Sequence, residues 1–166
     1  MKKEKIETIV YNSVIATLYV VLTYATLPIS YGQIQFRISE FLILLCFFRK
    51  DYVGGLVVGC AISNLLSTIG LFDVLFGTLA TLLACLFIMF SKHLLIAIIF
   101  PVLTNSFIVG FELFWLLKEP FWLSVLFVGI GELTVMIASY IVLLFFKKNK
   151  KFYSLIRANQ NINFKF

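Results

Sequence analysis

Apolar residues fill long stretches of this chain that no charged residue interrupts. A helix that crosses a bilayer needs ~20 consecutive, mainly apolar residues, because each residue adds ~1.5 Å to its length. Most of the uncharged stretches approach or exceed this length, which predicts membrane-spanning helices and not the core of a water-soluble domain. The stretches are residues 8–36, 52–72, 74–91, 94–111 and 133–146.

The pattern predicts an all-α integral membrane protein, a bundle of six transmembrane helices in a single domain over residues 1–166. Pro28 ends the first helix, because proline cannot continue the backbone hydrogen bonding. The second helix is too short to span a bilayer and should be tilted or packed against its neighbours. The predicted helices cover residues 8–27, 37–48, 52–66, 73–90, 94–117 and 121–146, and a cationic tail follows at 147–166.

Composition supports the same class: 61% of the residues are hydrophobic, 13% are charged, and the mean hydropathy is +1.03. An ordinary soluble domain has roughly 25% charged residues. The basic start followed by an apolar run resembles a secretory signal, but the apolar core of a signal is only ~7–15 residues long. The longer run here predicts a retained first helix.

The positive charges predict the orientation. With the amino end inside, twelve cationic residues fall in cytoplasmic segments, and only Arg37 and Lys118 fall on the other side. Because cationic loops resist translocation, we expect a multi-pass protein of the cell membrane with both termini in the cytoplasm. The net charge of +6 then needs no nucleic-acid partner, since a basic tail beside a bilayer meets anionic headgroups.

Signatures of catalysis are absent from the sequence. No glycine-rich phosphate loop precedes a Lys-Ser or Lys-Thr pair, so the chain has no recognisable means of hydrolysing ATP. The single histidine, His93, falls in a predicted turn, and the three cysteines lack metal-ligand spacing. We therefore predict that the chain is not an enzyme and carries neither cofactor nor metal.

Two glutamates lie inside predicted membrane helices. Glu132 falls ~16 Å into its helix, near the bilayer centre, where a carboxylate costs several kcal/mol unless it is paired, protonated or wet. Functional use is the leading hypothesis, and a protonated structural carboxyl is the alternative. Glu112 has Trp115 at i+3 and Asn105 two turns away, although an aromatic belt at the membrane interface would explain this group equally.

Further polar residues fall in the half of the membrane that we expect to face outside. Arg37 and Glu40 are spaced i, i+3 and could pair with each other, and Asn64 ends a predicted helix. Asp73 begins another helix, where capping is the simpler explanation. A polar cluster open to the outside predicts a capture site for an external polar ligand.

Two segments resemble a known family. Residues 31–40, with the sequence YGQIQFRISE, and residues 70–81, GLFDVLFGTLAT, are similar to motifs of the QueT family. That family is one of substrate-binding S components of energy-coupling factor (ECF) transporters for queuosine precursors. The resemblance implies six helices, cytoplasmic termini, and a partner module made of an ECF coupling transmembrane protein and two ATPase subunits. It also implies a small deazapurine substrate.

On this reading the substrate contacts come from carboxylates, amides, an arginine and an aromatic wall. A guanine-like edge suits one carboxylate, an aminomethyl cation suits a second, and a flat ring suits a tryptophan such as Trp115 or Trp122. The role of each glutamate stays open, as do an S component for another nucleobase or vitamin and a non-transporting membrane enzyme or assembly protein. The candidate substrate residues are Glu132, Glu112, Asn105, Trp115, Glu40, Arg37, Asn64, Gln35 and Gln33.

S components often dock to their coupling protein through an Ala-x-x-x-Ala pattern on the first helix, since small side chains permit close approach. Here the pattern is degraded to Ser13 and Thr17, with Ala16 and Val20 beside them as candidate partner-binding residues. The segment from Gln33 to Glu40 could also cover the site as a gate in which Arg37 braces a carboxylate. The alternative is a surface ion pair worth ~0–1 kcal/mol.

Overall fold

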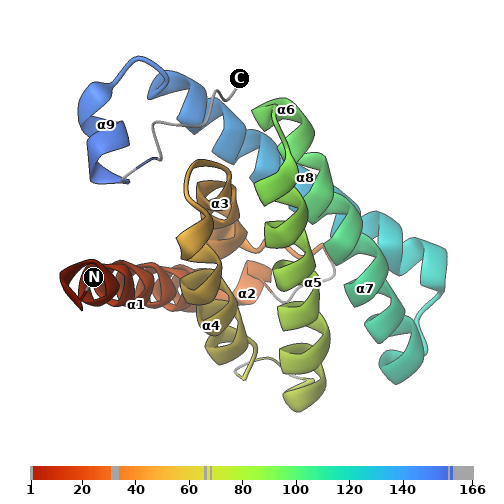
Figure 1. Ribbon diagram of the computed structural model, residues 1–166. Coiled ribbons are helices and arrows are strands. Elements are labelled where there is room, and N and C mark those ends of the chain that lie inside the picture. The colour runs from red at the N-terminus through yellow and green to blue at the C-terminus, as the bar shows by residue number, and fades with distance from the viewer. Residues whose placement is uncertain (1, 31–33, 66, 68, 157, 159–166) are drawn as a thin grey trace.

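The structure is a computed structural model that describes residues 2–30, 34–65, 67, 69–156 and 158. Every regular element in these ranges is a helix (Figure 1). The longer helices are α1 (Lys2–Ala25), α4 (Val53–Asn64), α5 (Leu71–Phe90), α7 (Ile99–Leu117) and α8 (Phe121–Phe145). The shorter elements are α2 (Leu27–Ser30), the 3₁₀ helix η1 (Ile38–Leu44), α3 (Leu45–Phe48), η2 (Lys50–Tyr52), α6 (Leu94–Ala97) and α9 (Lys150–Leu155).

Four of the described helical stretches are long and apolar enough to cross a membrane: Glu4–Ala25, Leu71–Phe90, Leu94–Leu117 and Phe121–Phe145. The short second helix is present as an apolar stretch over Ile38–Phe48, where a 3₁₀ turn leads into α3. The long helices therefore agree with the predicted ones in approximate position. The predicted end of the first helix is wrong, because α1 ends at Ala25 and Pro28 lies within α2. Six complete spans and cytoplasmic termini stay predictions.

The helices form an arc around η1. In space α1, α4, α5, α7 and α8 follow one another, each packed on the next, and η1 packs against α1, α5 and α8 (Figure 1). Because η1 contacts both ends of the arc, it occupies the middle of the bundle. The residues that open η1 are therefore surrounded by long helices and are not at an exposed helix start.

Glycines allow the closest helix contacts. A Cβ on Gly55 would overlap the backbone of Asn12, and one on Gly59 would lie 2.8 Å from Tyr19 Cβ, so α1 and α4 are in near-backbone contact. The side chain of Asn12 also accepts a hydrogen bond from the Gly55 N–H at 2.6 Å. This bond satisfies a backbone donor in the first turn of α4, where no intrahelical partner exists.

The main apolar core lies at the end of the bundle where α9 packs. It includes Leu44, Phe48 and Leu56, and the chain after α8 returns to cover it. Tyr52 Oη donates to the carbonyl of Ile156 at 2.6 Å, and the Phe48 and Tyr153 rings meet edge to face at 5.9 Å. Part of the predicted polar tail is thus a short helix whose aromatic side chains contact the core.

Candidate substrate-binding site

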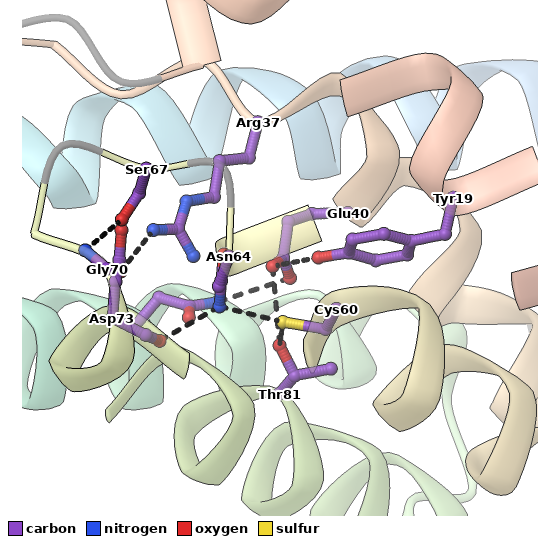
Figure 2. A network of polar contacts seen from close by, with 10 residues as sticks. Tyr19, Arg37, Glu40, Cys60, Asn64, Ser67, Gly70, Asp73 and Thr81 are labelled. Carbon is purple, nitrogen blue, oxygen red and sulfur yellow. Dashed lines mark hydrogen bonds and ion pairs between the residues drawn. The ribbon is translucent and has the colours of Figure 1, made fainter. Parts of the chain in front are cut away.

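The carboxylate of Glu40 is the centre of a buried polar network in the middle of the bundle (Figure 2). Its Oε1 accepts hydrogen bonds from Tyr19 Oη at 2.7 Å and from Thr81 Oγ1 at 3.4 Å. Its Oε2 accepts from Asn105 Nδ2 at 3.4 Å. Donors from α1, α5 and α7 therefore converge on one carboxylate of η1, and hydrogen bonds of this kind are what permit its burial.

Arg37, the residue before η1, makes an ion pair with Asp73 of α5 (Figure 2). The Nη2–Oδ1 distance is 3.0 Å, and both residues are buried. Asn64 Nδ2 donates to the backbone carbonyl of Asp73 at 3.0 Å, which joins the end of α4 to the pair. This network links the segment before η1, residues 34–37, to α4 and α5.

Two interpretations of the sequence are therefore wrong. Arg37 does not pair with Glu40, although their i, i+3 spacing allowed it, because Asp73 supplies a closer acid from another helix. Asp73 does not cap α5 either: the N-cap is Gly70, which has no side chain, and the Gly70 N–H donates to Ser67 Oγ at 3.0 Å. The Arg37 pair is buried, so it is not the weak surface interaction that was the alternative.

Several buried polar atoms near this network have no hydrogen-bond partner among the described residues. They belong to acids, amides and a hydroxyl from four different segments, which is unusual, since buried polar atoms are normally satisfied. A membrane interior makes the deficit costlier, because no bulk water is present. The atoms are both carboxylate oxygens of Glu112, Glu132 Oε1, Asn105 Oδ1, Gln35 Oε1 and Thr78 Oγ1.

The two glutamates with unsatisfied oxygens lie in different surroundings. Glu132 interacts electrostatically with Glu40 and Arg37. The side-chain amide of Asn105 lies within hydrogen-bonding reach of the Glu132 carboxylate. Glu112 instead has Asp73 and Arg37 as its charged neighbours. The two acids thus mark two parts of one buried polar region, both within range of Arg37.

The chain segment before η1 is packed tightly on α8 beside Glu132. A Cβ on Gly131 would overlap the backbone carbonyl of Gln35, so only glycine fits there without displacing the segment. On the other side, a Cβ on Gly77 would meet Asn64 Nδ2 and lie 3.1 Å from Arg37 Nη1. The segment is consequently held between α5 and α8, with its polar side chains turned into the bundle.

Most of the predicted substrate residues do meet in this region, and two aromatic candidates do not. Trp115 is 48% exposed and packs edge to face on Phe72, with ring centroids 5.9 Å apart. Trp122 is 73% exposed. Both therefore lie on the outer surface, and neither forms a wall beside the buried acids. The aromatic-belt alternative placed Trp115 at the surface but also had Glu112 reaching water, and the burial of Glu112 contradicts that part. Gln33 lies outside the described residues, while the others are Glu132, Glu112, Asn105, Glu40, Arg37, Asn64 and Gln35.

The candidate partner-binding residues lie along one side of α1. Ser13 and Thr17 are exposed, and their hydroxyls donate to backbone carbonyls of their own helix. Ala16 packs on Gly59 of α4, and Val20 is half-buried. A groove of about 490 Å³ runs between α1 and α4, and Ser13 and Ala16 line part of it.

Comparison with known proteins identifies the family. The family model of the QueT transporter matches residues 9–148. This chain belongs to the QueT transporter family. A protein of Lactococcus lactis subsp. cremoris named "Queuosine precursor transporter QueT" is 48% identical over 84 residues, which is 49% of this chain and 49% of that protein. The alignment thus spans about half the length of this curated relative. No solved structure matches the chain.

Family membership confirms the resemblance drawn from the two sequence motifs. Together with the four long apolar helices, it indicates a multi-pass membrane protein. In this QueT-family chain the two motifs meet in space. Arg37 and Glu40 of the first motif contact Asp73 and Thr81 of the second (Figure 2).

Four contributors to the network were not among the predicted site residues: Tyr19, Cys60, Asp73 and Thr81. The second motif carries Asp73 and Thr81, so that motif was the signal that could have placed them at the site. Tyr19 lies in α1, and no feature of the spacing marks it as the partner of an acid on η1.

Proposed function

We propose that this chain is the substrate-binding S component of an ECF-type importer and that it captures a queuosine precursor, a 7-deazaguanine-type base, from outside the cell. The observation that carries the proposal is the pair of buried glutamates, since both oxygens of Glu112 and Oε1 of Glu132 lack partners among the described residues. An ionisable group inside a membrane bundle marks a substrate pathway by default. A ligand rich in N–H donors would satisfy these acceptors.

The printed name of the Lactococcus relative supports the substrate class, since it describes that protein as a transporter of a queuosine precursor. The chemistry is compatible, because one edge of a deazaguanine presents a ring N–H beside an exocyclic amine. A carboxylate accepts such neighbouring donors well. The buried amides of Asn105 and Gln35 add further acceptors in the same region.

The partner module is inferred from the absence of a phosphate loop in the sequence and from the family resemblance. We propose that an ECF coupling transmembrane protein docks along α1, at Ser13, Ala16, Thr17 and Val20, and reaches into the groove between α1 and α4. Small side chains on this surface permit a partner helix to approach closely. Two ATPase subunits would supply the energy.

The test combines binding with uptake. Purified protein in detergent is titrated with 7-deazaguanine and its 7-aminomethyl derivative by calorimetry, with thiamine and riboflavin as comparison ligands. We expect saturable binding of the deazaguanines and none of the vitamins. In sealed vesicles, we expect repeated rounds of uptake only when the coupling protein and both ATPase subunits are present. Sustained uptake by this chain alone would contradict the S-component assignment, and binding of a vitamin in place of the bases would contradict the substrate class.

A further inference from the structure

The buried acids outnumber the buried bases in the described part of the chain. Arg37 is the one buried base there, and it already pairs with Asp73 at 3.0 Å. Glu40, Glu112 and Glu132 are buried as well, so the region has an excess of acidic groups. Burying uncompensated negative charge is costly, and a cationic ligand would offset part of that cost.

The surroundings of Glu132 favour a ligand edge with adjacent neutral donors. Glu40 Oε2 accepts from Asn105 Nδ2, which fixes the amide so that Asn105 Oδ1 faces away from Glu40. The same amide N–H group also lies within hydrogen-bonding reach of the Glu132 carboxylate. Asn105 Oδ1 and Glu132 Oε1 remain acceptors without partners among the described residues. Two such acceptors on neighbouring residues suit a ligand edge with more than one N–H group, such as a ring N–H and an exocyclic amine.

The surroundings of Glu112 favour a cation. Both of its oxygens are buried and unpartnered among the described residues, and no side-chain amide or hydroxyl there bonds to it. Its helix neighbours Val109 and Leu113 belong to a small apolar cluster. An ionised carboxylate only accepts hydrogen bonds, so in such surroundings it is best satisfied by an ammonium group, which brings three donors and a compensating charge.

The spacing suits one ligand that reaches both acids. Asn105 and Glu112 lie on the same helix, α7, seven positions apart, which corresponds to about two turns or ~10 Å along the axis. A bicyclic base with a one-carbon amine arm has dimensions of this order once a hydrogen bond is added at each end. The two acids can therefore bind opposite ends of the same molecule.

We infer a division of roles, which rests on the proposed function: Glu132 and Asn105 bind the N–H edge of the base, and Glu112 binds the ammonium group of its side arm. Glu112 is then the residue that determines specificity for a cationic precursor over an uncharged one. Glu132 contributes equally to binding of the cationic and the uncharged precursor, because the two molecules share the same ring edge.

The test measures two probes against three variants by calorimetry. The probes are 7-aminomethyl-7-deazaguanine, which is cationic, and unsubstituted 7-deazaguanine. Wild type should bind the cationic probe about tenfold or more tightly. Glu112→Gln should bring the affinity ratio near one and leave 7-deazaguanine binding unchanged. Glu132→Gln should weaken both probes about tenfold or more and preserve the ratio. Glu119→Gln, which removes an acid from the α7–α8 loop, is the control and should change neither.

The outcomes separate this inference from the proposed function. If wild type binds both probes and Glu112→Gln weakens both equally, the division of roles is wrong and the substrate class stands. If wild type binds neither probe, the proposed function fails and the division fails with it. Should the glutamine variants not fold, wild type is titrated with the N-acetylated aminomethyl probe, which is neutral. Affinity equal to that of the cationic probe would overturn the role of Glu112.

Discussion

Removing the acid from the buried Arg37–Asp73 pair should cost far more than removing the acid from the exposed pair of the same chain. Asp73→Ala leaves a buried guanidinium without its carboxylate, and such a loss typically costs ~3–5 kcal/mol. Arg49 and Asp51 are closer still, at 2.8 Å, but the Asp51 side chain is 53% exposed. An exposed pair contributes ~0–1 kcal/mol, so Asp51→Ala is the matched control.

The measurement is the free energy of unfolding of the purified protein, from reversible denaturation in mixed detergent micelles. A second comparison isolates the charge: Arg37→Met with Asp73→Leu removes both partners and should recover part of the stability, because apolar replacement of a buried pair is often neutral or favourable. If Asp73→Ala is no more destabilising than Asp51→Ala, the pair does not fix the segment before η1. In that case the account of how the site is held together is wrong.

Two further predictions test close contacts. Gly131→Ala should displace the Gln35 carbonyl and weaken 7-deazaguanine binding measured by calorimetry, whereas Gly129→Ala meets only a serine hydroxyl, which can rotate, and should leave binding unchanged; equal effects would contradict the role of the segment. Asn12→Ala removes the acceptor for the Gly55 N–H and should lower the free energy of unfolding by about 0.5–2 kcal/mol, as loss of a helix cap does; an unchanged value would show that the interhelical cap is not stabilising.

The sequence predicted the helices better than it predicted their contacts. Hydropathy locates long apolar helices because lipid imposes a minimum length on them, and α5, α7 and α8 lie close to where they were predicted. The i, i+3 spacing rule predicted contacts less well, because it relates residues within one helix and not residues of different helices. Asp73 is 36 positions from Arg37, and only the tertiary packing of η1 on α5 brings the two together.

Trp115 shows why the i, i+3 rule misled. The buried residues of α7 include Asn105, Val109, Glu112 and Leu113, which define a narrow stripe facing the bundle. A step of three residues rotates ~60° short of a full turn, so a neighbour of a buried residue can lie outside the stripe. Trp115 does so and reaches the surface, where an amphipathic ring is well placed at a membrane interface.

On the proposed function, the chain segment that begins at Arg37 and continues through η1 and α3 also affects how a bound base could cross the membrane. Its start carries Arg37 and Glu40, while its continuation through Leu44, Phe47 and Phe48 is buried in the apolar core that α9 covers. Moving a polar group into such a core without hydrogen bonds costs roughly 2–7 kcal/mol, and a base has several such groups. A base held at the polar start would therefore not pass along the segment through the packed core described here. On the proposed function, release requires the helices to move relative to one another or to the bilayer, which is work that a partner with ATPase subunits can supply and that binding alone cannot.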